Sequence, residues 1–368
     1  MRNIVFIVGT AIYNGDGYKS RIMMEIDILK KYHKLYILLP EYKNIKTHKD
    51  IEFGNDVIVL KYNTYSGLIG KIKSLKAFKN ELLQVKEKIN NPVYYCESLM
   101  PAFKTSCFLK KKDCIVFDCH GSEADEFYLY HNNLIGKGIY YILKMCERKV
   151  INNSKLIITV TEAQYYKWNI TKKYLVLPML PSKHFFDVAN YRREIRNKLN
   201  IPNDKIVYVY SGSDAKWQLC KETIRYYKEI ENNQKNTFLL ILTQNKVYFE
   251  ELLIKENINS YKVCKVNYLE MPAYLDACDF GFCLRNDSIV NRVASPTKVL
   301  EYLARNVKPI LTEFVGDFSR QLGNYACVID INKCVIKIYK ETQFNGKNFV
   351  KCYQEEKIKE YLKCIDDL

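Results

Sequence analysis

Short runs of hydrophobic residues alternate along this chain with longer segments in which hydrophobic residues recur every three or four positions. Runs typical of buried strands lie at 3–9, 35–39, 57–60, 114–118, 156–160, 206–210, 237–243, 261–266 and 280–284. Segments typical of amphipathic helices lie at 18–31, 66–90, 250–257, 271–278, 296–305 and 349–368. Strands that alternate with helices in this way predict parallel sheets with helices on both faces.

The length of the chain and two prolines near its middle predict two domains. The chain has 368 residues, of which 48% are hydrophobic, enough for two cores in domains of about 180 residues each. Pro178 and Pro181 interrupt the pattern before a second alternating set begins at Ile206. We therefore expect one α/β domain over 1–180, a second over 181–345, and a helical segment over 346–368.

The charge of the chain is strongly positive and unevenly distributed. The formal net charge is +16, and residues 1–180 hold 28 Lys and Arg against 17 Asp and Glu. The first domain is therefore expected to meet a negatively charged partner. The hydrophobic run at 4–8 is too short for a signal peptide, and no stretch approaches the roughly 18 residues of a membrane span, so we expect a cytoplasmic protein.

The cysteines do not indicate a metal centre. The sequence has 13 cysteines, but they are scattered, no two form a C-x-x-C motif, and Cys119-His120 has no second pair at zinc spacing. We expect reduced thiols that act as small hydrophobic side chains, and no bound metal.

The helix predicted after the strand at 280–284 begins with positive charge. Ser295 suits the N-cap and Pro296 the first helical position, which places Lys298 in the first turn and Arg285 on the preceding loop. Cations at a helix N-terminus oppose the helix dipole, whereas the unpaired N–H groups there attract anions. The arrangement is typical of a phosphate-binding site.

Glu301 lies one turn beyond Lys298, about 4.5 Å along the axis and on the same helix face. A carboxylate at that position accepts hydrogen bonds from hydroxyl groups. The alternative is an ordinary surface ion pair between Lys298 and Glu301, which would stabilise the helix by only a few tenths of a kcal/mol.

Two other strands are followed by loops that suit a ligand. After the strand at 206–210, Gly212 lets a ligand approach the backbone and Lys216 can reach a phosphate. After the strand at 3–9, the loop contains Gly15 and Gly17, although their spacing is not the dinucleotide fingerprint. Either loop can also be a plain turn.

His120 follows the strand at 114–118, where parallel sheets place their ligand sites, and acidic residues surround it. Asp118 can orient the imidazole ring or hold the loop, and Glu123 lies a few residues beyond. A lone histidine is more often structural, so both interpretations stay open. The helix at 66–90 carries lysines opposite its hydrophobic stripe, which are either a solvated face or a surface for anionic lipid.

Residues 281–304 resemble the donor-site segment of bacterial family-4 retaining glycosyltransferases of the GT-B fold, through Pro296-Thr297-Lys298 and the run from Glu301 to Ala304. The resemblance implies two doubly wound Rossmann-like domains facing a cleft, with the last helix crossing back to the first domain. It implies that the lysine and helix start hold a nucleoside diphosphate and that the glutamate binds the ribose. The donor-binding residues it implies are Gly212, Lys216, Arg285, Asn291, Ser295, Pro296, Thr297, Lys298 and Glu301.

Acceptor and sugar contacts follow from the same resemblance. They are Gly15, Gly17, Arg21, Asp118, His120 and Glu123, and the residues expected to act in catalysis are His120, Lys216 and Lys298. One departure concerns the donor sugar: this family usually has a second glutamate eight positions before the ribose-binding one, where this chain has Val293. The resemblance therefore does not indicate which sugar is bound.

The sequence predicts a retaining, metal-independent glycosyltransferase that uses a nucleotide-sugar as substrate and needs no cofactor. Its expected acceptor is a saccharide or lipid-linked saccharide of bacterial surface polysaccharide synthesis, and its basic first domain is expected to meet the inner face of the membrane. One alternative is a sugar-nucleotide epimerase of the same fold. Another is a basic nucleic-acid-binding protein, which the absence of a base-reading motif disfavours, so we expect no nucleic-acid partner.

Overall fold

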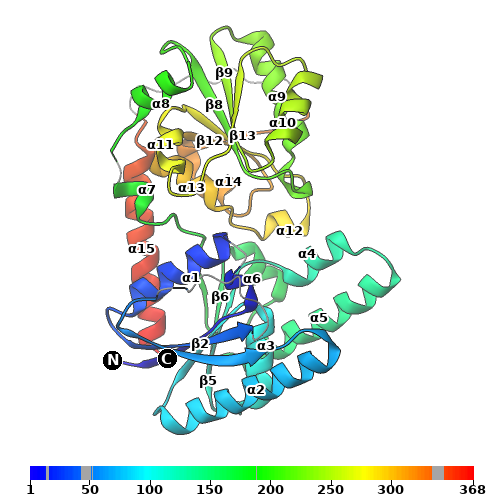
Figure 1. Cartoon of the computed structure of the whole chain (residues 1–368), viewed down its shortest axis with the longest axis vertical. Helices are drawn as coiled ribbons and strands as arrows, with labels where there is room; N and C mark the ends of the chain where they lie inside the picture. The colour runs from blue at the N-terminus through cyan, green and yellow to red at the C-terminus, as the bar shows by residue number, and fades with distance from the viewer. Residues whose placement is uncertain (14–15, 43–50, 52, 188, 334–343) are drawn as a thin grey trace. The chain divides into compact units, whose positions relative to one another are not determined.

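The computed structural model describes residues 1–13, 16–42, 51, 53–187, 189–333 and 344–368. The chain divides into two compact units, which Figure 1 shows in the colours of the sequence. Unit 1 comprises Met1–Pro178 and Lys357–Leu368, and unit 2 comprises Met179–Glu356.

Unit 1 is built on a sheet of seven parallel strands in the order β3-β2-β1-β4-β5-β6-β7. The strands are β1 (Asn3–Ile7), β2 (Lys34–Tyr42), β3 (Val57–Thr64), β4 (Val93–Glu97), β5 (Cys114–Cys119), β6 (Leu156–Thr159) and β7 (Tyr174–Val176). β1 and β4 are hydrophobic at almost every position, as expected for central strands that are covered on both faces.

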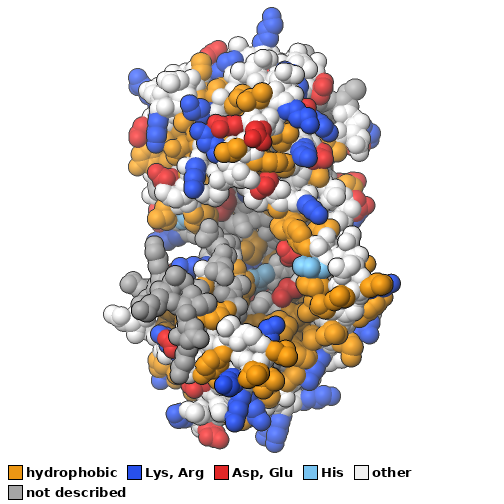
Figure 2. Space-filling model, turned by 45° about the vertical axis from the view of Figure 1, so that its right-hand side comes forward, with side chains coloured by type: hydrophobic (Ala, Val, Ile, Leu, Met, Phe, Trp, Pro, Cys, Tyr) orange, Lys and Arg blue, Asp and Glu red, His pale blue; other side chains and the backbone are white. Residues whose placement is uncertain are grey.

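Helices connect these strands and cover the sheet of unit 1. They are η1 (Thr10–Tyr13), α1 (Asp16–Leu29), α2 (Gly67–Lys88), α3 (Leu99–Phe108), α4 (Glu123–Tyr130), α5 (Leu134–Asn153), α6 (Glu162–Trp168) and the last turns of α15 (Gly346–Asp366). Phe78 and Leu82 of α2 pack into a core with Tyr94 and Phe117 of the sheet. Other hydrophobic side chains stay on the surface, and Figure 2 shows them gathered over one side of this unit.

Unit 2 contains a second parallel sheet with the order β10-β9-β8-β11-β12-β13. Its strands are β8 (Ile206–Ser211), β9 (Thr237–Leu242), β10 (Tyr261–Cys264), β11 (Phe280–Cys283), β12 (Lys308–Thr312) and β13 (Cys327–Ile329). Its helices are α7 (His184–Asp187), α8 (Arg192–Lys198), η2 (Lys216–Gln218), α9 (Cys220–Asn233), α10 (Lys246–Lys255), α11 (Met271–Asp276), α12 (Ile289–Arg292), α13 (Thr297–Ala304), α14 (Phe318–Gln321) and η3 (Gly323–Tyr325).

The two sheets confirm the predicted parallel α/β architecture. In each sheet the strand order reverses beside one central strand, between β1 and β4 in unit 1 and between β8 and β11 in unit 2. Such reversals place helices on both faces and open a crevice at the carboxyl ends of the strands, where α/β proteins bind ligands.

Two local expectations need correction. The sequence analysis did not identify β4, a five-residue strand buried throughout, because a short continuous run carries no periodic signal. It also assigned the N-cap of α13 to Ser295, whereas the cap is Pro296 and the Oγ of Ser295 instead accepts the N–H of Met179 at 3.0 Å. A partner more than a hundred residues away therefore determines how this helix begins. Among the described residues, no helix is both long and hydrophobic enough to cross a bilayer.

Candidate functional site

Two loops of unit 2 meet at the ammonium group of Lys298. Lys298 stands in the first turn of α13, and its Nζ donates a hydrogen bond to Oε1 of Gln218 at 2.6 Å. A Cβ added to Gly212 would lie 2.8 Å from that Nζ, and the backbone there has φ +148°. Only glycine combines this conformation with so close an approach. The structure thus brings together Gly212 and Lys298, which are far apart in the sequence.

Lys298 is enclosed by uncharged groups and by a second cation. Its Nζ lies over the ring of Tyr210, 5.0 Å from the centroid. Burial, together with the smaller effect of the positive charge of Arg285, lowers the pKa of Lys298 to about 8. The nearest carboxylate in the same helix, Glu301, offsets only part of this effect.

Arg285 is 5% exposed, and among the described residues its guanidinium donates one hydrogen bond, from Nη1 to the adjacent carbonyl of Leu284 at 3.2 Å. Its backbone is fixed, because Thr312 Oγ1 accepts the Arg285 N–H at 2.9 Å and donates to the Arg285 carbonyl at 2.6 Å. Within the described part of the chain, neither Arg285 nor Lys298 forms an ion pair. Buried cations without a counter-charge are costly, so this arrangement suits an anionic ligand.

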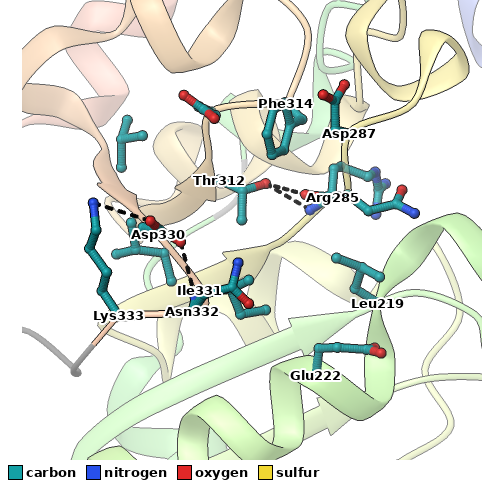
Figure 3. A pocket seen from close by; sticks show the side chains of 14 residues that line it. Leu219, Glu222, Arg285, Asp287, Thr312, Phe314, Asp330, Ile331, Asn332 and Lys333 are labelled. Atoms are coloured by element: carbon teal, nitrogen blue, oxygen red, sulfur yellow. Dashed lines mark hydrogen bonds and ion pairs between the residues drawn. The ribbon is translucent and has the colours of Figure 1, made fainter.

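A cavity of about 850 Å³ opens beside Arg285 at the carboxyl ends of β11, β12 and β13. Figure 3 shows that Thr312 and Phe314 line it from β12 and the following loop, and Asp330 from the segment after β13. This volume is within the usual range for small-molecule sites. Arg285 therefore belongs both to the cavity and to the surroundings of Lys298.

Glu301 is buried one turn beyond Lys298 and accepts a hydrogen bond from the Tyr268 hydroxyl at 3.0 Å. Burial raises the pKa of Glu301 to about 7, while Tyr268 and Lys298 oppose the rise. The Tyr268 ring in turn packs against His184, with centroids 4.9 Å apart. The surface ion pair considered above is not observed, because Glu301 is buried and, among the described residues, Lys298 and Glu301 form no ion pair with each other.

The remaining donor-side residues occupy the same loops. Asn291 is buried, and its amide donates to the backbone carbonyl of Asn286 at 3.1 Å and to its side-chain oxygen at 2.6 Å, which fixes the loop after β11. Pro296 caps α13 and Thr297 is its first residue, while Lys216 is exposed on η2. The N–H groups of Thr297 and Lys298 find no acceptor among the described residues, as is usual at a helix start.

Unit 1 holds a different cluster of charges at the ends of β4 and β5. Asp118 accepts hydrogen bonds from Nε and Nη2 of Arg21, at 3.0 and 2.8 Å. The same guanidinium lies 3.1 Å from Oε1 of Glu25, and it donates to the carbonyl of Leu177 at 3.0 Å. Arg21, Glu25 and Asp118 are all buried. Arg21, proposed above for the ligand side, is thus fully engaged with other residues of unit 1.

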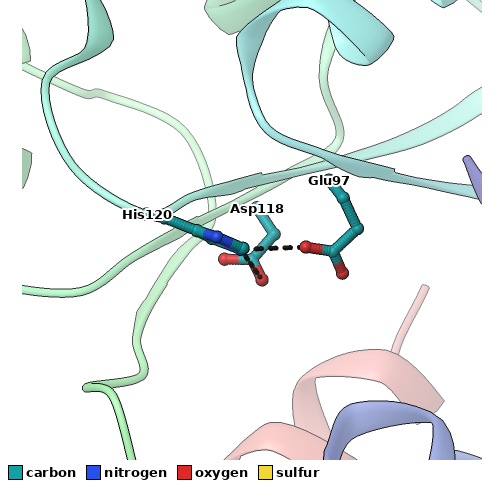
Figure 4. Close-up of side chains that lie close together, drawn as sticks. All are labelled: Glu97, Asp118 and His120. Carbon is teal, nitrogen blue, oxygen red and sulfur yellow. Dashed lines mark hydrogen bonds and ion pairs between the residues drawn. The ribbon is translucent and has the colours of Figure 1, made fainter. Parts of the chain in front are cut away.

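His120 faces two carboxylates in this cluster. Its Nε2 lies 2.8 Å from Oε2 of Glu97 and 3.3 Å from Oδ2 of Asp118, as Figure 4 shows. The other side of the ring packs at 51° to Tyr18, with centroids 5.1 Å apart. His120 keeps 16% of its side chain exposed, so it is the member of the cluster that can reach a ligand.

The protonation of this cluster balances its charges. Burial and, to a smaller extent, the charge of Asp118 raise the pKa of Glu97 to about 8. Burial likewise raises the pKa of Glu25 well above its usual value. Burial alone would also raise the pKa of Asp118, but Arg21 and His120 together hold it below its usual range. One ionised carboxylate is thus paired with Arg21, and protons neutralise the others.

Glu97, Asp118 and His120 offer ligand atoms within 4.8 Å of one another, so we tested whether they fit a metal ion. Asp118 is already bound on both oxygens by the Arg21 guanidinium, and a cation added there would lie beside a buried positive charge. These residues therefore do not fit a metal site.

The other first-domain candidates are spread around this cluster. Oε1 of Glu123 accepts the N–H of Leu99 at 2.6 Å, which satisfies the start of α3. Gly17 lies in the first turn of α1, and Gly15 lies outside the described residues.

Sequence reasoning missed Glu25, Glu97 and Tyr268. Glu97 ends β4 as Asp118 ends β5, so the strand-end rule that identified Asp118 would have found it had β4 been recognised. Glu25 lies four residues from Arg21, but its burial beside Glu97 and Asp118 joins it to distant strands, and Tyr268 reaches Glu301 from 33 positions away, so neither gave a local signal.

No family model and no curated protein sequence matches this chain. Its structure is similar to that of a sucrose-phosphate synthase from Thermosynechococcus elongatus, with a TM-score of 0.70 at 12% identity over 100% of this chain and 99% of the other. It is also similar to Anabaena HepE in complex with UDP and glucose, with a TM-score of 0.66, 12% identity and 100% of each chain covered.

A third similar structure is that of WaaG, a glycosyltransferase involved in lipopolysaccharide biosynthesis, with a TM-score of 0.61 at 12% identity over 97% of this chain and 90% of the other. At this level of identity the likeness establishes the fold and not the activity. The chain has the GT-B fold, as the sequence resemblance implied.

Proposed function

We propose that this protein is a retaining glycosyltransferase that moves a sugar from a nucleotide-sugar donor to a saccharide or lipid-linked saccharide acceptor in bacterial surface polysaccharide synthesis. The observation that carries the proposal is a pair of cations, the partly buried Lys298 and the buried Arg285, neither of which forms an ion pair among the described residues. A nucleoside diphosphate supplies the missing negative charge. The complexes of HepE with UDP and glucose support this ligand class.

The residues around Lys298 suit each part of such a donor. The diphosphate would bind Lys298, Arg285 and the N–H groups at the start of α13, where Gly212 leaves room for close approach. Glu301 would accept hydrogen bonds from the ribose hydroxyls, because a buried carboxylate with one hydroxyl partner retains accepting capacity. Lys216 on η2 would provide a further phosphate contact.

Sugar transfer requires stabilisation of the charge that builds on the β-phosphate as the nucleoside diphosphate leaves. Lys298, Lys216 and Arg285 would bind this charge more strongly in the transition state than in the ground state. Because these cations perform the role of a metal ion, we expect activity that persists in a chelator. His120, the exposed member of the cluster in unit 1, would contact the sugar or acceptor, and the basic face of unit 1 would associate with an anionic membrane surface.

A thermal-shift panel of UDP-, GDP-, ADP- and CMP-linked sugars tests the donor assignment. One of them should stabilise the protein, by about 2.7 kcal/mol at a hundred times its Kd, and the Lys298→Ala variant should lose the effect. Absence of stabilisation by every member of the panel would overturn the proposal. With the stabilising donor, glycosyl transfer to an added acceptor supports a transferase, and epimerised free nucleotide-sugar supports the alternative enzyme.

A further inference from the structure

One helix of unit 1 exposes a stripe of large hydrophobic side chains. The stripe comprises Leu134, Ile135, Ile139, Ile142 and Met145 of α5, and Leu134 is 89% and Met145 69% exposed. These positions recur every three or four residues, so they share one face of the helix. Gly136, Cys146 and Val150 of the same helix are buried, and α5 packs against α3 and α4. The exposed side chains of the stripe are therefore additional to the residues that hold the helix in place.

The beginning of α2 exposes hydrophobic side chains as well. Leu68, Ile69 and Ile72 are 80%, 70% and 67% exposed, whereas the large buried residues of α2 lie in its second half. Both α2 and α5 pack against α3, and all three helices contribute to one core, so they cover the same face of the sheet. Figure 2 shows hydrophobic side chains gathered over this side of unit 1.

The sequence stretches that carry these side chains contain basic residues but no acidic ones. No Asp or Glu occurs in the sequence between Asp56 and Glu81 or between Glu126 and Glu147. These two stretches instead contain exposed lysines, which are Lys71, Lys73, Lys76, Lys79 and Lys137, besides Lys61, which pairs with Glu41. Two copies of such a face would repel each other, whereas a hydrophobic surface rimmed by lysines complements anionic lipid.

We propose that the stripe of α5 and the first turns of α2 insert among the headgroups of an anionic phospholipid bilayer, with the α2 lysines bound to lipid phosphates. This inference deepens the proposed function by assigning the membrane contact to named residues. It adds hydrophobic insertion to the electrostatic attraction considered above. Because it involves no residue of the Lys298 region, it can fail or hold independently of the donor assignment.

Sedimentation with vesicles tests the proposal on the full chain. Wild-type protein should bind vesicles of phosphatidylcholine mixed with phosphatidylglycerol and bind pure phosphatidylcholine vesicles far less. The triple change Ile135→Ser, Ile142→Ser and Met145→Ser should lower the partition coefficient by about 100-fold, because three hydrophobic side chains no longer insert. The change of Lys71, Lys73 and Lys76 to Gln should lower it by about 100-fold at low salt and less at high salt.

Matched controls come from unit 2. Val247 and Ile254 of α10 are each 66% exposed, so the double change to Ser removes similar side chains from another helix and should leave vesicle binding unchanged. Lys298→Ala should also bind vesicles as wild type does. The melting temperature of the stripe variant should match that of wild type, because the altered side chains are exposed.

Three outcomes would overturn the proposal. The first is that the stripe variant binds vesicles as well as the wild type does. The second is that the unit 2 control loses as much vesicle binding as the stripe variant. The third is a protein that does not bind vesicles and forms a dimer in sedimentation velocity that the stripe variant abolishes, because the hydrophobic face would then pack against a second copy.

Discussion

The two units both bury charged side chains at the carboxyl ends of their strands, but only one of them balances those charges internally. In unit 1, Arg21 is held between Asp118 and Glu25, and the raised pKa of Glu97 keeps a further negative charge out of the cluster. In unit 2, Lys298 and Arg285 face a neutral amide, an aromatic ring and carbonyl oxygen. Burial alone is therefore no sign of a ligand site, whereas burial of an uncompensated charge is.

Breaking the balanced cluster should have the largest effect on folding. Arg21→Met leaves Asp118 buried without its partner, so the free energy of unfolding should fall by about 3–5 kcal/mol in urea denaturation. Arg292→Met is the control, because Arg292 pairs with Asp287 on the surface and should cost less than about 1 kcal/mol. Equal losses in the two variants would show that the unit 1 cluster contributes no more than a surface pair.

Removing the uncompensated cation should affect binding and not folding. Lys298→Ala should weaken binding of the matching nucleoside diphosphate by about 100-fold in calorimetric titration, since a buried charge-assisted contact is lost. Its free energy of unfolding should stay equal or rise, because the change removes a partly buried ammonium that has no ion pair among the described residues. Lys221→Ala, an exposed lysine of the same unit, is the control. The contrast between the two units would be contradicted if Lys298→Ala lost stability and yet bound the nucleoside diphosphate as tightly as the wild type.

The raised pKa of Glu97 predicts a pH dependence of stability. The folded protein holds this proton up to a pH of about 8, whereas the unfolded chain releases it near 4.5. The unfolded state thus binds fewer protons in this window, so stability should fall as the pH rises from about 4.5 to 8. Glu97→Gln cannot ionise and should flatten this slope, as urea midpoints at pH 5 and pH 8 would reveal. An identical pH dependence of stability in the wild type and in Glu97→Gln would show that Glu97 is not protonated in the folded protein.

The smallest expected effect concerns the approach to Lys298. Gly212→Ala forces a residue with φ +148° to carry a Cβ and displaces the ammonium that lies 2.8 Å from that position. We expect a loss of roughly 1 kcal/mol in stability and about tenfold weaker nucleotide binding. Gly323→Ala is the control. Its backbone also has a positive φ, +49°, but the added Cβ meets open space, so it introduces backbone strain without displacing Lys298. Equal nucleotide affinity in the two alanine variants would count against the role of Gly212.

The sequence predicted the strands and helices that carry these charged residues, but it did not predict which charges lie beside one another. Its periodicity predicted the strand before Gly212 and the helix that carries Lys298 and Glu301, because these are local patterns. It could not predict that Gln218 meets Lys298, or that Glu25 and Glu97 lie beside Asp118, because those contacts join separate strands and helices. The burial of Glu301 and the partial burial of Lys298 were missed for the same reason, so a surface pair remained an alternative.

The most direct test of the central claim counts the protons exchanged when the nucleoside diphosphate binds. The pKa of Lys298 is about 8 in the free protein, and an anion beside it should raise that value. Calorimetry at pH 8 in buffers of different ionisation enthalpy should therefore detect uptake of about half a proton per diphosphate bound. Binding without proton uptake at this pH would contradict the claim that the diphosphate neutralises the uncompensated positive charge of Lys298 in unit 2.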